Sequence, residues 1–192
     1  MPEPSEHFAF LLSRRSVPAR QLREPGPDDR TIARLLELAV RVPDHGALAP
    51  WRFLLIRGAA REALGALLVA RRRELEPEAA PAELEKDRCR FLRAPVVIAV
   101  IARIARGHRI PKQEQLLSAG LAAYNLLLGA HALGFAGQWL TGWPAYDGEI
   151  ARRLGLGPEE RIVAFVHLGS ADGASPDRPR PDPRALLSEW QP

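Results

Sequence analysis

Side chains able to bind an anionic or planar ligand gather in three short clusters of this 192-residue chain. The first is Arg14-Arg15-Ser16, where two guanidiniums and a hydroxyl stand within three residues. Guanidiniums bind phosphate through charge-assisted, often bidentate hydrogen bonds, so this cluster is a candidate phosphate site. The alternative is a helix C-terminus whose arginines face the negative end of the helix dipole.

The second cluster lies in the loop that runs from residue 41 to residue 53. Arg41 and His45 stand four residues apart there, and a cation and an imidazole on one loop can face the polar edge of a planar ligand. The alternative is that Asp44 and His45 only satisfy backbone groups of the turn. A hydrolytic site is not indicated, because the chain lacks the Gly-x-Ser-x-Gly string of a nucleophile elbow.

The third cluster is the segment 134–142, in which glycines bracket Trp139, Leu140 and Thr141. Glycine lets a backbone approach a flat ligand closely, and Gly142 could turn its amide toward a ring nitrogen. The alternative is an ordinary strand and turn. The chain contains neither Gly-x-Gly-x-x-Gly nor a Walker A string, so a Rossmann or P-loop nucleotide site is not supported.

Cysteine and histidine do not indicate a metal site. Cys89 is the only cysteine, so we expect no internal disulfide and no structural zinc. Arg88 and Arg90 flank it and can lower a thiol pKa, although a packing role is the more frequent one for a lone cysteine. The histidines outside the second cluster lack metal-ligand spacing; they are His7, His108, His131 and His167.

Composition favours a globular protein with one sizeable core, since 46% of the residues are hydrophobic and 26% are charged. No uncharged apolar run reaches the roughly 18 residues of a membrane helix. The first four residues do not open a signal peptide, so we expect a cytoplasmic protein without a membrane partner. The net charge of +4 raises nucleic-acid binding as an alternative, but the arginines alternate with acids, as in residues 71–74, which favours a solvated surface.

Hydrophobic periodicity predicts a mixed order of helices and strands, which favours an α+β layer fold. The apolar run 95–101 is the clearest strand, and its continuity implies burial on both faces. We predict further strands at 51–56, 134–140 and 161–168, and helices at 5–12, 28–42, 60–75, 81–92, after residue 111, and at 147–154.

The chain is predicted to form a single domain over residues 1–192, with a proline-rich C-terminal tail from about residue 171. Prolines alternate with charges after Ser175, at positions 176, 179, 181 and 183. Proline fixes φ and removes a hydrogen-bond donor, so we expect the tail to run extended along a surface or onto a partner.

Taken in order, these segments resemble the nitroreductase family, and in particular its short bacterial members. The resemblance spans nearly the whole chain. It rests on Arg14-Arg15-Ser16, the Arg41-x-Pro43-Asp44-His45 loop leading to Pro50-Trp51-Arg52-Phe53, Arg93-Ala94-Pro95, Glu114 with Ser118-Ala119-Gly120, and Gly134-Phe135 leading to Trp139.

The resemblance implies a small antiparallel sheet flanked by helices, a homodimer, and FMN bound at the dimer interface. It implies that Arg14, Arg15 and Ser16 hold FMN and that Arg41 and His45 reach it from the other subunit. Trp139, Leu140 and Thr141 would lie along the isoalloxazine ring. Arg180 resembles a basic position near the C-terminus that meets the phosphate in some members.

The function implied is reduction of small oxidised molecules such as nitroaromatics or quinones, in a ping-pong cycle with NADH or NADPH as donor. The flavin carries the chemistry, so no catalytic side chain is expected. An alternative within the family is a relative that uses the flavin for dehalogenation or processes the flavin itself. A more distant alternative is a basic module that binds nucleic acid.

Overall fold

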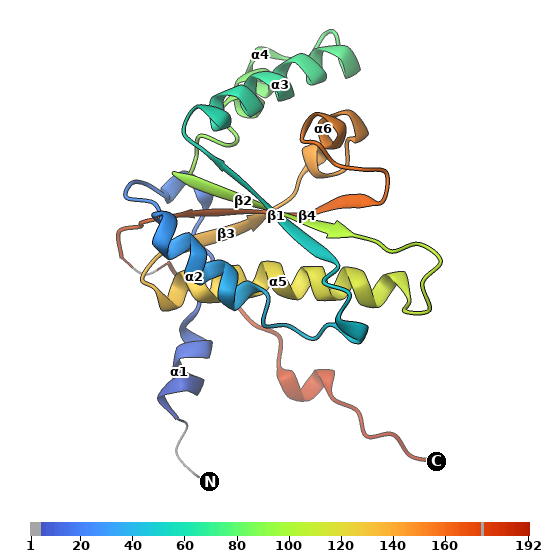
Figure 1. The fold of residues 1–192 in the computed structure, drawn as a ribbon. Helices are drawn as coiled ribbons and strands as arrows, with labels where there is room; N and C mark the ends of the chain where they lie inside the picture. The colour runs from blue at the N-terminus through green and yellow to red at the C-terminus, as the bar shows by residue number, and fades with distance from the viewer. Residues whose placement is uncertain (1–4, 174) are drawn as a thin grey trace.

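The computed structural model describes residues 5–173 and 175–192. At its centre lies a four-stranded sheet in the order β1-β2-β4-β3, in which each neighbouring pair is antiparallel. Figure 1 shows α3, α4 and α6 on one face of the sheet and α2 and α5 on the other. The architecture confirms the predicted α+β fold with a small antiparallel sheet.

The predicted elements all appear in the structure, with small differences at their ends. The strands are β1 (Trp51–Arg57), β2 (Val96–Arg103), β3 (Ala136–Leu140) and β4 (Glu160–Gly169). The helices are α1 (Glu6–Ser13), α2 (Asp29–Ala39), α3 (Ala59–Leu75), α4 (Pro81–Arg88), α5 (Lys112–Ala132) and α6 (Gly148–Arg153). Short 3₁₀ turns are η1 (Ala19–Gln21), η2 (His45–Ala47), η3 (Trp143–Ala145) and η4 (Pro183–Leu186).

The prediction about a signal peptide concerns the first four residues, which lie outside the described part of the chain. Among the described residues, no helix combines the length and the apolarity that crossing a membrane requires.

Strand β2 lies in the interior of the sheet and is buried on both faces. Its residues from Val96 to Ala102 are all buried. Val96, Ile98 and Val100 pack with the α2 and α5 side, whereas the alternate residues pack with the α3 and α6 side. The burial on both faces that the apolar run predicted is therefore confirmed.

Helix α2 begins where predicted and ends three residues earlier. The carboxylate of Asp28 caps its first turn by accepting a backbone hydrogen bond at 2.8 Å. At the other end, the side-chain amide of Asn125 on α5 donates to the carbonyls of Leu38 and Arg41 at 3.1 Å each. The last carbonyls are thus satisfied from a neighbouring helix, which lets the chain leave the helix after Ala39.

Helix α5 packs closely because small residues line its buried side. A Cβ atom on Gly129 would stand 3.0 Å from the Leu38 side chain of α2, so the two helices approach each other where glycine leaves room. The opposite side of α5 presents large apolar side chains to solvent; these include Leu117, Leu121 and Tyr124, which are 60%, 42% and 40% exposed. We call these three residues the α5 apolar face.

The edge of strand β3 carries the segment that follows α1. The amide of Val17 donates to the carbonyl of Gly137 at 3.1 Å, and the amide of Ala19 donates to the side chain of Gln138 at 2.6 Å. A Cβ atom on Gly137 would lie 2.9 Å from both Leu127 and Leu168, so glycine lets β3 lie against the core. These bonds fix the chain directly after the first basic cluster.

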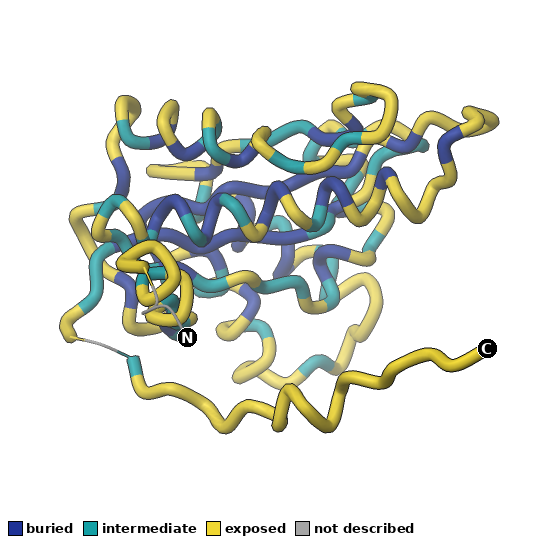
Figure 2. The backbone as a smooth tube through the Cα atoms, turned by 90° about the horizontal axis from the view of Figure 1, so that it is seen from below, coloured by how far each residue is buried: buried dark blue, intermediate teal, exposed yellow. Residues whose placement is uncertain are grey.

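The C-terminal tail leaves the sheet after residue 170, which pairs with Arg23. Figure 2 shows its last part as an exposed tube running away from the buried core. Within residues 175–192, η4 forms a short turn, which the Asp182 carboxylate caps by accepting a hydrogen bond from the Arg184 amide. Leu186, Leu187 and Trp190 stay largely exposed.

Candidate functional site

The two ends of the chain meet in one basic pocket of about 170 Å³. Arginines and one serine hydroxyl dominate its lining, and such a donor set suits the oxygens of a phosphate. The lining residues are Arg14, Arg15, Ser16, Pro176, Asp177, Arg178 and Arg180. The structure therefore brings four of the predicted site residues together, including Arg180 of the tail.

Asp177 is the one acidic side chain that lines this basic pocket. Its carboxylate lies 2.8 Å from the guanidinium of Arg15 and 2.8 Å from that of Arg180. The hydrogen bond from Arg180 is the main cause that holds the pKa of Asp177 below its ordinary value. The arginines of the pocket thus face a carboxylate of the same chain, in an arrangement that also suits the oxygens of an anionic ligand.

Sequence reasoning missed Asp177. The tail repeats Pro, Asp and Arg with little variation, and Asp177 and Asp182 stand in similar surroundings in it. Only the folded chain distinguishes them, because Asp177 meets Arg15 whereas Asp182 caps a turn of its own segment.

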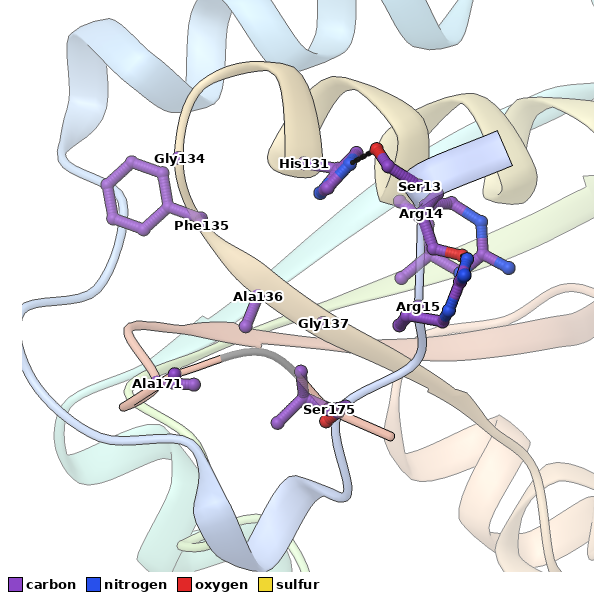
Figure 3. Close-up of a pocket in the computed structure, with 13 residues that line it drawn as sticks. Ser13, Arg14, Arg15, His131, Gly134, Phe135, Ala136, Gly137, Ala171 and Ser175 are labelled. Carbon is purple, nitrogen blue, oxygen red and sulfur yellow. Dashed lines mark hydrogen bonds between the residues drawn. The ribbon is translucent and has the colours of Figure 1, made fainter. Parts of the chain in front are cut away.

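A second cavity, of about 280 Å³, shares Arg14 and Arg15 with the basic pocket. Figure 3 shows Arg14 and Arg15 beside it, with His131 turned toward Ser13. His131 Nε2 lies 2.8 Å from the Ser13 hydroxyl, and its ring stacks on Phe10 at 5.0 Å between centroids. Burial, followed by the charges of Arg14 and Arg15, lowers the pKa of His131, so the neutral ring is favoured here.

Arg14 also connects the basic pocket with the α5 apolar face. Its guanidinium lies 5.9 Å from the centre of the Tyr124 ring, within the range of a cation–π contact. The cationic and the apolar parts of the surface are therefore continuous at this point.

Strand β3 turns its predicted site residues to opposite faces. Trp139 is 36% exposed and its ring lies beside Gly120 of α5, since a Cβ atom there would be 3.9 Å from the indole. Leu140 points the other way and packs on the cluster that contains Val17 and Ala94. Its side chain is committed to packing, so only its backbone is available to a ligand at the strand edge.

The loop that contains Arg41 and His45 does not reach the basic pocket. It leads into β1, which is the sheet edge opposite β3. Arg41 lines a separate groove between α2 and α5 with Arg34 and Leu133. The structure thus divides the predicted site residues of one chain between two regions.

Within this loop, Asp44 and His45 have different roles. The Asp44 carboxylate accepts hydrogen bonds from the amides of Leu48 and Ala49 at 3.2 and 2.8 Å, so Asp44 stabilises the turn locally. His45 Nδ1 lies 2.8 Å from Oε2 of Glu114 at the start of α5, and its imidazole is 63% exposed. Asp44 thus satisfies backbone groups of the turn, whereas the contact of His45 is with a side chain of α5.

Cys89 has no sign of an activated thiol. Its Sγ donates to Oε1 of Glu85 at 2.9 Å, and this bond is the main cause that raises the pKa of the thiol. The charge of the flanking Arg88 acts to lower the pKa of the thiol, but Glu85 and burial outweigh it. Within residues 5–173 and 175–192, no group of three or more His, Cys, Asp or Glu side chains is placed to hold a metal ion.

Comparison with solved structures shows the same fold in other bacterial proteins. A nitroreductase-like protein from Bacillus cereus superimposes with a TM-score of 0.81 at 22% identity, over 100% of this chain and 99% of that chain. A protein from Desulfovibrio desulfuricans, provisionally named a nitroreductase and solved in complex with FMN, gives 0.74 at 24% identity, over 98% and 99% of the two chains.

Comparison of the sequence with known proteins shows the family of the chain as well as its fold. YdjA of Escherichia coli (strain K12), provisionally named an NAD(P)H nitroreductase, is 33% identical over 183 residues, which cover 93% of this chain and 96% of that protein. The model of the nitroreductase family matches residues 11–170, a span that includes the first basic cluster and ends where β4 leaves the sheet. The chain belongs to the nitroreductase family.

Proposed function

We propose that this chain is an FMN-dependent oxidoreductase that uses NADH or NADPH to reduce small oxidised organic molecules such as nitroaromatics and quinones. The observation that carries the proposal is the basic pocket in which Arg14, Arg15, Ser16 and Arg180 converge beside the edge of β3. The Desulfovibrio protein was solved with FMN and YdjA is named for NAD(P)H, which supports the same chemistry.

The phosphate of FMN would bind in the basic pocket. Arg14, Arg15 and Arg180 can donate charge-assisted hydrogen bonds there, and Ser16 can add a neutral one. The pocket already holds the carboxylate of Asp177 in the manner of an anionic ligand, so its donor set fits this end of the cofactor.

The isoalloxazine ring would lie along the end of β3. Trp139 offers a partly exposed aromatic surface, while Leu140 and Thr141 offer backbone groups at the edge of the sheet. Gly142 follows with a φ of +70°, a left-handed turn that glycine adopts without strain and that ends the segment at Thr141. The residues present therefore fit the ring as well as the phosphate.

A second copy of the chain would complete the site. Arg41 and His45 lie near the sheet edge opposite the basic pocket, so a role for them at the same flavin requires another subunit. The α5 apolar face and the exposed Leu186, Leu187 and Trp190 of the tail give such a dimer apolar surface to bury. We propose that Arg41 and His45 act in trans across this interface.

The chemistry that FMN would supply is hydride acceptance from NADH or NADPH and electron transfer to the oxidised acceptor, in two half-reactions. The protein's part is to hold the phosphate, to orient the ring against β3, and to place cationic groups near it. No side chain needs to form a covalent bond with the substrate.

Separate measurement of the two half-reactions tests this proposal. The FMN-loaded protein, kept free of oxygen, should lose its yellow colour on addition of NADH or NADPH. A nitroaromatic or a quinone should then restore the colour with one equivalent of reduced product. Reduction of neither acceptor, together with release of halide from a halogenated aromatic, would favour the dehalogenase alternative instead.

A further inference from the structure

A buried carboxylate binds three donors on the face of the sheet occupied by α3 and η3. Asp87 is fully buried, and it accepts hydrogen bonds from Arg72 at 2.9 Å, Arg90 at 3.1 Å and the indole of Trp143 at 2.9 Å. Burial acts to raise the pKa of Asp87, but the donors outweigh it and hold the pKa below its ordinary value. A charged Asp87 therefore ties together α3, the end of α4 and η3.

The two guanidiniums around Asp87 differ in how many of their donors form hydrogen bonds. Arg72 also bonds to Glu76 at 2.9 Å and lies over the Trp143 ring at 4.7 Å, so its charge and its donors are engaged. Arg90 is 16% exposed and donates one hydrogen bond to Asp87. Its Nε atom is buried and has no hydrogen-bond partner in the described part of the chain.

The Arg90 guanidinium lies directly against Gly142. A Cβ atom on Gly142 would stand 2.8 Å from Nη1 of Arg90, so a side chain at this position would require the guanidinium to shift. Gly142 also has a φ of +70°, which L side chains rarely adopt. The guanidinium is therefore packed against the backbone turn that directly follows Trp139, Leu140 and Thr141.

We propose that Arg90 is a positioning residue for the flavin, which fixes the Gly142 turn and places a fixed positive charge behind the segment 139–141. This inference rests on the proposed FMN site at that segment. Arg90 acts through the turn and does not touch the ring. Asp87 pairs with Arg90 at 3.1 Å and offsets part of its charge. The positive potential that remains at the Gly142 turn should favour the reduced form of bound FMN over the oxidised form.

A comparison of three variants tests this role. Arg90→Gln removes the charge but keeps a side chain that can still donate to Asp87. Arg90→Lys keeps the charge. Arg88→Gln is the matched control, because Arg88 carries the same charge two residues away, is 53% exposed, and pairs with Glu85 on its own helix.

The measurements are the dissociation constant of oxidised FMN, the midpoint potential of bound FMN, and the thermal unfolding midpoint of each apoprotein. We expect R90Q to bind oxidised FMN within about threefold of wild type. Relative to oxidised FMN, its reduced FMN should bind at least tenfold more weakly, which for a two-electron couple lowers the potential by about 30 mV. R90K and R88Q should keep the wild-type potential and unfold near the wild-type temperature. The R90Q apoprotein should unfold at a lower temperature, because the buried Asp87 loses one cationic partner.

An unchanged potential in R90Q would overturn the inference, as would an equal fall in R88Q, which would indicate only a general effect of charge. If R90Q folds too poorly to load FMN, Arg90→Met replaces it, since it also removes the charge but keeps an unbranched side chain that can pack. A fall of about 30 mV then supports the role, and an unchanged potential contradicts it. Failure of the wild-type protein to bind FMN would instead overturn the proposed function.

Discussion

Arg15 and Asp177 form an ion pair of 2.8 Å that ties the proline-rich tail to the loop after α1. The same carboxylate also lies 2.8 Å from Arg180, so it neutralises two of the arginines proposed to bind phosphate. In the folded protein Asp177 therefore competes with any anion that enters the basic pocket.

Replacing Asp177 by Asn should strengthen FMN binding, because the variant leaves Arg15 and Arg180 available to the phosphate. We expect a gain of about threefold to tenfold at about 0.01 M salt that largely disappears at about 1 M salt, where charges are screened within a few ångströms. Asp182→Asn is the control, since Asp182 belongs to the same tail and caps η4. Weaker FMN binding by D177N would show that Asp177 organises the pocket.

Mixed dimers test the proposed action in trans. Arg14→Ala and His45→Ala homodimers should each bind FMN at least tenfold more weakly, a loss of about 1.4 kcal/mol. A heterodimer of the two variants should regain one wild-type site of its two, because one subunit supplies an intact Arg14 and the other an intact His45. If the heterodimers regain no wild-type site, Arg14 and His45 do not act on one FMN from different subunits, and the proposed action in trans is wrong.

Asp87→Asn should lower the free energy of unfolding of the apoprotein by about 3 kcal/mol, because it leaves two partly buried guanidiniums without their shared carboxylate. Glu83→Gln on the same helix removes an exposed pair with Lys86 and should change stability by less than about 0.5 kcal/mol. Denaturant titration measures both. An equally small loss of unfolding free energy in both variants would mean that the charge of Asp87 adds little to the stability of the fold.

Glu160 should make stability depend on pH in the acid range. Its carboxylate takes two hydrogen bonds from Arg52, at 2.7 and 2.8 Å, and these are the main cause that lowers its pKa from 4.5 to about 2. Because the folded state lowers this pKa, the charged Glu160 stabilises the fold above about pH 4.5, and this stabilisation is lost as the pH falls toward about 2.

The variant Glu160→Gln should accordingly be less stable than wild type at neutral pH, by about 1–2 kcal/mol. The difference should shrink below pH 4.5 and vanish near pH 2. Denaturant titration across this range checks it, with the exposed Glu78→Gln as control. If the stability difference between Glu160→Gln and wild type does not change with pH, it arises from packing and not from the charge of Glu160.

The elements of the fold were predictable because each depends on local pattern. The apolar run at 95–101 required burial on both faces, and Asp28 marked the start of α2 as a helix cap does. The end of α2 was predicted too late, since it depends on Asn125, a residue of another helix. Contacts between distant segments leave no periodic signal.

The candidate site was predictable only in part for the same reason. Arg14, Arg15 and Ser16 stand out as a string, and resemblance pointed to Arg180. Asp87 could not be recognised, because it lies in a charged helix that reads as solvated throughout, and only its neighbours from α3 and η3 show that it is buried. Leu140 was named for its place in a motif, whereas its side chain faces the packed cluster at Val17.

Direct titration of the purified apoprotein with FMN, followed by the quenching of flavin fluorescence, tests the central claim. The account predicts saturation at one FMN per chain, a rise in the thermal unfolding midpoint on binding, and at least tenfold weaker binding when Arg14 or Arg15 is replaced by Ala. A wild-type protein that quenches no FMN fluorescence and unfolds at the same temperature with and without FMN would contradict it.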